Sequence, residues 1–110
     1  MRSRGDHAEQ QARRYLEQHG LRFVAANVHC RFGELDLLMR HNNYLVFVEV
    51  KFRQQQGFGG ALAAVSASKQ QKLRLTAQWY LQQQGSLDLP CRFDVVAITG
   101  DQINWIENAF

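Results

Sequence analysis

Residues 44–51 read YLVFVEVK, and this run carries the strongest strand signal of the chain. It is rich in β-branched and aromatic residues, which are enriched in strands. Its apolar side chains fall on both faces, as they do in a strand that is covered from both sides. We therefore expect residues 44–51 to form a central strand, with helices packed against its sheet.

Two helices and four shorter strands are expected around this central strand. Apolar residues at helical spacing predict one helix from about Arg4 to His19 and another from Ser66 or Ser68 to about Gln84. Strand patterns are found in four further segments: Leu21–Ala26, Glu34–Met39, Phe93–Thr99 and Ile103–Ile106. Residues 52–60 contain three glutamines and three glycines, which predicts a loop. The order αβββαββ predicts an α/β fold with a mixed central sheet of about five strands flanked by two helices. Without a repeat or linker, residues 1–110 are expected to form a single domain.

The overall composition is that of an ordinary globular protein, with 45% hydrophobic and 21% charged residues. The net charge is +3 and ten of the thirteen cations are arginine, which is compatible with a polyanionic partner. The first residues have no apolar signal-peptide core, and no apolar run approaches the ~20 residues of a membrane span. Cys30 and Cys91 have no metal-ligand spacing, so both are expected to be small buried residues. We therefore expect a reduced, cytoplasmic protein that does not bind membranes.

Three residues suggest a metal site. Glu49 and Lys51 are two positions apart on the central strand, so their side chains share a face. Asp36 lies on the preceding strand, and antiparallel pairing would bring it within reach of Glu49. Two neighbouring carboxylates repel each other unless a proton or a cation lies between them, and oxygen ligands suit Mg²⁺ (or Mn²⁺). Lys51 could then orient or deprotonate an attacking water, or offset charge on a phosphoryl oxygen.

An alternative reading makes Glu49 and Lys51 a plain ion pair at a sheet edge, because short patterns of this kind are frequent. Regular alternation places Glu34 beside Asp36, on the face opposite to Leu35, Leu37 and Met39. Glu34 is expected to support a metal ligand more than to bind the metal itself.

Arg53 and Lys69 are candidates for binding the phosphate backbone of a substrate. Arg53 adjoins the predicted loop, and Lys69 lies near the positive end of the second helix. A solvated surface lysine is the alternative for Lys69.

The runs GELDLL at 33–38 and VFVEVKFR at 46–53 resemble the signature of the YraN-like family of small bacterial proteins. The resemblance covers nearly the whole chain and continues in Ala8-Glu9, Tyr15-Leu16, Lys69, Ala77 and the run RFDVV at 92–96. The family is similar in fold to the PD-(D/E)XK nuclease superfamily, which has a restriction endonuclease-like core. Two positions depart from the family pattern: Phe52 replaces a small polar residue, and Ala8 replaces a glycine.

This resemblance implies roles for individual residues. Asp36 matches the metal-binding aspartate, and Glu49 and Lys51 match the (D/E)XK residues. The carbonyl group of Val50 is a further candidate ligand. Glu9 matches an acidic residue that many members carry on the first helix, so the implied catalytic set is Glu9, Asp36, Glu49 and Lys51.

Three functions are compatible with these observations. The first is a metal-dependent nuclease that hydrolyses phosphodiester bonds in nucleic acid, with DNA as the expected substrate. The second is a nucleic-acid-binding module that keeps the fold but does not cut, and the third is a homo-oligomeric scaffold. Whether the chain is an enzyme stays open at this point, although an intact acidic set favours the nuclease.

Overall fold

The computed structural model describes residues 4–53, 65–85 and 89–110. The elements are helix α1 (Arg4–Gln18), strands β1 (Arg22–Cys30), β2 (Gly33–His41) and β3 (Tyr44–Arg53), helix α2 (Ala67–Gln84), and strands β4 (Cys91–Thr99) and β5 (Gln102–Ile106). The predicted order of helices and strands is confirmed. The predicted loop over 52–60 lies outside the described residues from position 54 onward. Within the described ranges, no helix combines the length and apolar character needed to cross a membrane.

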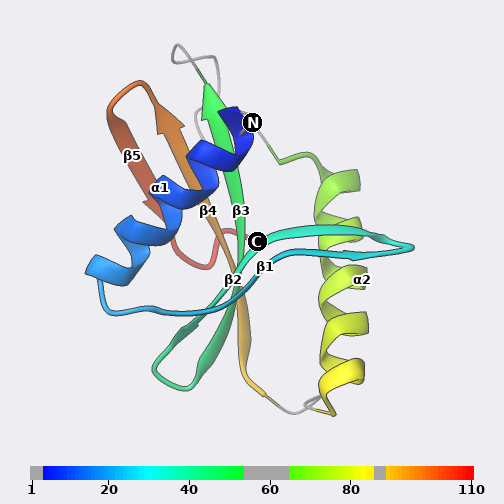
Figure 1. The fold of residues 1–110 in the computed structure, drawn as a ribbon. Coiled ribbons are helices and arrows are strands. Elements are labelled where there is room, and N and C mark those ends of the chain that lie inside the picture. Colours follow the sequence, from blue (N-terminus) through cyan, green and yellow to red (C-terminus); the bar gives the residue numbers. More distant parts are fainter. Residues whose placement is uncertain (1–3, 54–64, 86–88) are drawn as a thin grey trace.

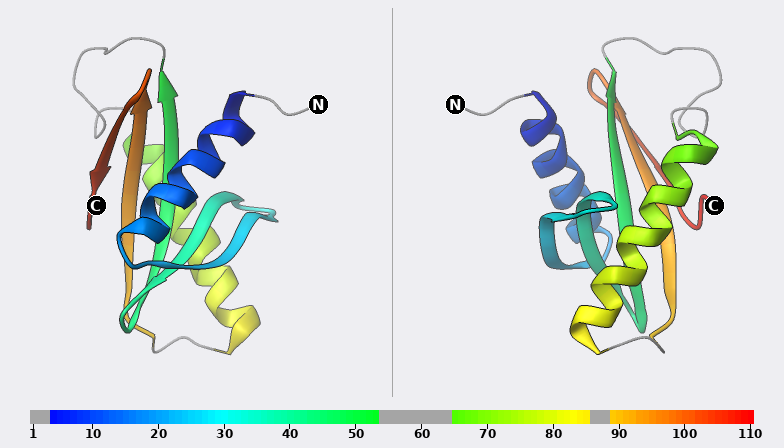
Figure 2. Two further views of the ribbon diagram at one scale, coloured as in Figure 1. Left: turned by 60° about the vertical axis from the view of Figure 1, so that its left-hand side comes forward. Right: turned by 90° about the vertical axis from the view of Figure 1, so that its right-hand side faces the viewer.

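The five strands form one mixed sheet in the order β1-β2-β3-β4-β5. β3 is the central strand, as predicted, and pairs antiparallel with β2 and parallel with β4. The other two pairs are antiparallel. The parallel pair requires a crossover, since a tight turn cannot join parallel strands, and α2 lies in that connection. Figures 1 and 2 show α1 on one face of the sheet and α2 on the other.

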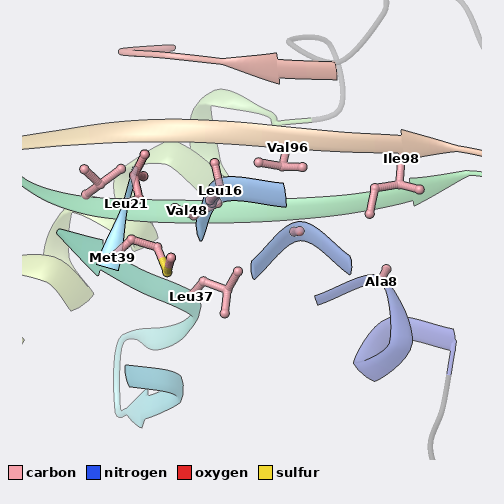
Figure 3. Packing of buried hydrophobic residues seen from close by; sticks show 10 residues of the cluster. Ala8, Leu16, Leu21, Leu37, Met39, Val48, Val96 and Ile98 are labelled. Atoms are coloured by element: carbon pink, nitrogen blue, oxygen red, sulfur yellow. The ribbon is translucent and has the colours of Figure 1, made fainter. Parts of the chain in front are cut away.

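Each face of the sheet carries its own hydrophobic core. On the α1 side, Ala8 and Leu16 pack against Val48 of β3 and against Val96 and Ile98 of β4 (Figure 3). Burying these side chains favours the docking of α1, at roughly 25 cal/mol per Å² of apolar surface. The core on the α2 side is built from residues of the sheet, of α2 and of the segment just before it: Leu35, Leu38, Leu45, Phe47, Val65, Leu73, Ala77 and Val95.

The alternation of side chains along β2 is interrupted at Asp36. Leu37 and Met39 belong to the α1-side core, whereas Leu35 and Leu38 belong to the α2-side core. The expectation that Leu35 shares a face with Leu37 and Met39 is therefore wrong. The strand loses its regular period of two where Asp36 bonds to the neighbouring strand through its side chain, as described below.

Both helices end as their sequences predict. Gly20 adopts a left-handed φ of +93°, which lets the Leu21 amide donate to the Leu16 carbonyl at 3.1 Å. Ser66 caps α2 by accepting from the Lys69 amide at 3.1 Å, and Gly85 closes it with a φ of +69°. The alternative cap, Ser68, lies within the first turn of α2.

A buried aspartate ties the C-terminal part of the chain together. Asp94 on β4 is fully buried and accepts hydrogen bonds from Arg92, from the Trp105 indole at 2.9 Å and from the Asn108 amide at 2.9 Å. A second guanidinium nitrogen of Arg92 lies 2.9 Å from Nδ1 of His41. The carboxylate is thus satisfied by neighbours from β4, β5 and the C-terminal residues, as a buried charge must be.

Candidate metal centre

Strands β2 and β3 separate at Asp36, and this separation creates the candidate site. Their pairing runs from His41 opposite Tyr44 to Leu37 opposite Val48. One step further along, the Val50 amide donates to Oδ2 of Asp36 at 2.9 Å. A carboxylate takes the position where a strand carbonyl would continue the ladder, and this bond fixes the Asp36 side chain beside the end of β3.

Glu49 lies in the interior next to Asp36. It alternates with Leu45 and Phe47 of the α2-side core, and only 5% of its surface is exposed. Among the residues that the structure describes, no hydrogen-bond partner is found for its buried Oε2. Nζ of Lys69 lies 3.4 Å from that oxygen, within ion-pair distance but without the geometry of a hydrogen bond. A buried oxygen without a hydrogen bond is costly and calls for an explanation.

Asp36 is close enough to Glu49 to influence its ionisation. Burial, then a hydrogen bond to Asp36 and the charge of Asp36, raise the pKa of Glu49 from 4.5 to about 8, although Lys69 and Lys51 act in the opposite direction. Two carboxyl groups form a hydrogen bond only when one is protonated. The raised pKa of Glu49 is in the direction expected for neighbouring carboxyl groups, which repel each other unless a proton or a cation lies between them.

Asp36 also belongs to a second group of acids on the α1 side. One carboxylate oxygen each from Glu9, Glu34 and Asp36 lies within 4.8 Å of the others. Glu9 is half-buried on α1, and Glu34 is exposed, with His29 Nδ1 at 3.7 Å from its carboxylate. The structure thus brings together Glu9 and Asp36, which only the resemblance had linked. It also puts Glu34 near enough to bind a cation directly. The sequence had predicted only a supporting role for Glu34.

Lys51 lies on the same face as Glu49 but is not its ion-pair partner. In the register with β4, Glu49 is opposite Val95 and Lys51 is opposite Ala97, and both of these neighbours pack on the α2 side. In the described part of the chain, the ion pair of Glu49 is formed by Lys69. The simple Glu49–Lys51 ion pair is therefore absent from the structure, and Lys51 acts on Glu49 only through its charge.

The two expected substrate-binding residues are placed differently. Lys69 lies in the first turn of α2, with its amine near Glu49 and its side chain still 43% exposed. Arg53 ends β3 opposite Thr99, and its side chain is outside the described structure. The contact between Lys69 and Glu49 had no signal in the sequence beyond the match of Lys69 to the family pattern, because it depends on where α2 crosses the sheet.

The donor set fits a hard divalent cation. All candidate ligand atoms are oxygens, from Asp36, Glu49, Glu9 and Glu34, together with the Val50 carbonyl. Mg²⁺ and Mn²⁺ prefer such ligands and keep waters in their remaining positions. Oε2 of Glu49 lacks a hydrogen bond among the described residues, so this buried oxygen could accept a further ligand beside Lys69.

The fold and the site define an α/β protein with carboxylates gathered where two strands of a mixed sheet separate. Residues 8–98 match the family described as "Uncharacterised protein family UPF0102", and the chain belongs to this family. A UPF0102 protein of Enterobacter sp. (strain 638) is 56% identical over 108 residues, which cover 96% of this chain and 82% of the relative. UPF0102 proteins of Shewanella baltica (strain OS155) and Shewanella frigidimarina (strain NCIMB 400) are 54% and 55% identical over 106 residues, covering 96% of this chain and 97% of each relative. The likeness to the PD-(D/E)XK superfamily stays a prediction.

Proposed function

We propose that this protein is a metal-dependent nuclease of the PD-(D/E)XK kind, which hydrolyses phosphodiester bonds in nucleic acid, with DNA as the expected substrate. The observation that supports it best is the buried Glu49 carboxyl beside Asp36, with one oxygen that lacks a hydrogen bond. A protein whose acids served only the fold would gain stability by replacing them with apolar residues. Strongly perturbed acids in groups are more typical of active sites.

In this proposal Asp36, Glu49 and the Val50 carbonyl hold Mg²⁺ or Mn²⁺, with Glu9 and Glu34 on the other side of Asp36. When bound, such an ion polarises the scissile phosphate and lowers the pKa of a bound water. Lys51 extends from the same face as Glu49, where its amine can orient the attacking water or offset charge on a phosphoryl oxygen. Lys69 and Arg53 contact the phosphate backbone of the substrate.

Metal binding is the first test, and calorimetry with Mn²⁺ and Mg²⁺ measures it without a substrate. Asp36→Asn should weaken binding at least tenfold, or about 1.4 kcal/mol, because it removes a charged ligand shared by both acid groups. Asp101→Asn is a matched control, since Asp101 is an exposed acid in the turn between β4 and β5. Equal metal affinity in the Asp36 and Asp101 variants would contradict the proposed metal centre, and with it the proposed nuclease.

Cleavage is the second test. The purified chain is incubated with double-stranded DNA, single-stranded DNA and RNA, with Mg²⁺, with Mn²⁺ or with EDTA. Cleavage should require the metal and should be lost in Glu49→Gln, and the preferred nucleic acid identifies the substrate. A metal-binding protein that cuts none of these substrates would contradict the nuclease proposal.

A nucleic-acid-binding module that does not cut is the second candidate. The ion pair between Lys69 and Glu49 favours it, because a carboxylate that already has a cationic neighbour has less need of a metal. Such a module would bind DNA equally well in EDTA and in Mg²⁺, and Glu49→Gln would leave that binding unchanged. The scaffold alternative predicts an oligomer, which light scattering after gel filtration measures as mass in solution.

A cytoplasmic location belongs to the same proposal. Cys30 and Cys91 are both free and half-buried, which suits a reducing compartment.

A further inference from the structure

Two arginines face each other at the end of β2 that is remote from Asp36. Arg22 at the start of β1 lies directly opposite Arg40 near the end of β2. The Cβ atoms of such cross-strand pairs are about 4.5–5.5 Å apart, so the two side chains leave the sheet next to each other. Both arginines are exposed. In the described ranges, neither side chain makes an ion pair, a hydrogen bond or a ring contact.

The arginine pair lines a depression in the surface. Its volume is about 310 Å³, and its lining consists of Gly20, Arg22, Arg40 and Asn42. Gly20 comes from the turn after α1 and Asn42 from the turn between β2 and β3, and both have left-handed φ values, +93° and +55°. A Cβ atom added at Gly20 would meet no atom within 4 Å, so the depression is open on that side. Two turns and two cationic side chains thus surround one small concave space.

Among the residues that the structure describes, no acidic side chain pairs with either arginine. The carbonyl end of α1 would be a natural counter-charge, but at least two of its carbonyl groups accept hydrogen bonds from the chain itself. The Leu16 carbonyl accepts from the amides of His19 and Leu21, and the Glu17 carbonyl accepts from Gly20. Like charges directly opposite in a sheet are destabilising. An anion between the two side chains would relieve this repulsion.

We propose that this depression binds a phosphate group, either inorganic phosphate or a phosphate of a nucleic-acid backbone. Guanidinium groups match phosphate oxygens through paired N–H donors, and two of them converge here. The depression is separate from the carboxylates of the candidate metal centre, which lie at the other end of β2. The proposal does not depend on nuclease activity.

The test uses the full chain in EDTA and titrates inorganic phosphate while heteronuclear NMR follows the backbone amides. Saturable shifts should concentrate at residues 20–22 and 40–42. Arg22→Gln and Arg40→Gln should each weaken phosphate binding by about tenfold or more, and Arg14→Gln should leave it within about twofold. Arg14 is the matched control, because it is an exposed arginine in α1 and its substitution changes the net charge equally.

A stability measurement gives an independent readout. In low-salt buffer without phosphate, Arg22→Gln should raise the melting temperature, since it removes a like-charge pair, whereas Arg14→Gln should not. Shifts that weaken equally in all three variants, or phosphate that does not bind the parent chain, would overturn the proposal.

A short DNA duplex, titrated in the same buffer, separates the two sources of phosphate. Duplex binding that falls in the Arg22 and Arg40 variants, but not in Arg14→Gln, identifies a backbone phosphate. If the Arg22 and Arg40 variants lose binding of inorganic phosphate but keep duplex binding, the natural ligand is the free anion. Both results support a phosphate site at the arginine pair.

Discussion

Glu49 carries an ionisable group into the interior of the protein, so the ionisation of this carboxyl group is a probe of the candidate metal centre. Its raised pKa has burial as the main cause and Asp36 as the second. Lys69 and Lys51 both lower the pKa of Glu49, but only Lys69 lies within ion-pair distance of its carboxylate. Substitutions at these positions therefore separate stability from chemistry.

The pH dependence of stability is the first prediction. Between pH 4.5 and about 8, native Glu49 binds a proton that the unfolded chain has lost, so the free energy of unfolding falls as pH rises through this window. The contribution is fully present below pH 4.5 and is lost above pH 8. Glu49→Gln keeps a neutral side chain, so the variant should gain on the parent by at least about 1.4 kcal/mol across the window.

Urea unfolding of both proteins at several pH values from about 4.5 to above 8, in EDTA, measures this difference. Glu17→Gln is the control, because Glu17 is an exposed acid of α1 that pairs with Arg13 on the surface. If the parent and Glu49→Gln follow parallel curves over the whole range, Glu49 is not protonated in the native state.

Lys51 and Lys69 provide the second prediction. Lys51→Ala should abolish cleavage while leaving metal binding and stability almost unchanged, because the ion pair of Glu49 is formed by Lys69. Lys69→Ala removes that partner and should cost roughly 1–2 kcal/mol in EDTA, between the values of exposed and buried pairs. Thermal unfolding with and without Mg²⁺ measures both. A Lys51 variant that unfolds well below the Lys69 variant, and that Mg²⁺ does not rescue, would show that Lys51 is structural.

The strands and helices themselves were largely predictable. The run of residues 44–51 specified a central strand, and the caps Ser66 and Gly85 marked the ends of α2, because these signals are local. The far half of β1 was not predicted. Its residues after Ala26 are mixed in polarity, and Asn27 has a φ of +53°, which interrupts any regular pattern.

The site was predictable only in its short-range part. Asp36 and Glu49 could be placed together because one hairpin joins their strands. The break in the alternation of side chains at Asp36 could not be predicted, because it follows from a hydrogen bond between the Asp36 side chain and the Val50 amide. The approach of Lys69 to Glu49 depends on the position of a helix twenty residues further along, for which a sequence pattern carries no information.

The junction of β4, β5 and the C-terminal residues supports the third prediction. Asp94→Ala removes the acceptor shared by Arg92, Trp105 and Asn108, and leaves Arg92 partly buried without its carboxylate. The free energy of unfolding should fall by about 3–5 kcal/mol, the usual cost of breaking a buried pair. Chemical denaturation measures it, with Asp101→Asn as the exposed control. A loss no larger than that of the control would mean that the network contributes little.

The proposed binding of nucleic acid would depend on the charge distribution of the whole molecule, and its response to salt is the fourth prediction. With ten arginines among thirteen cations, binding should be dominated by phosphate contacts and should weaken steeply as salt is added. Fluorescence anisotropy with a labelled duplex, measured at several salt concentrations in EDTA, gives the slope. Lys69→Gln should make the slope shallower by about one charge. Affinity that does not change with salt, or no binding at low salt, would favour the scaffold.

The parallel pairing of β3 with β4 also determines how this protein can fold. Leu45 pairs with Cys91, which comes 46 positions later in the chain, whereas β1, β2 and β3 are joined by short turns. The first three strands can pair early through local contacts, but the β3–β4 ladder must wait for the long crossover to close, and such non-local pairing is slow. The acids Glu9, Asp36 and Glu49 all precede that crossover. The repulsion between Asp36 and its neighbouring acids is therefore already present while one edge of β3 is still open, and a cation bound at that stage would speed folding.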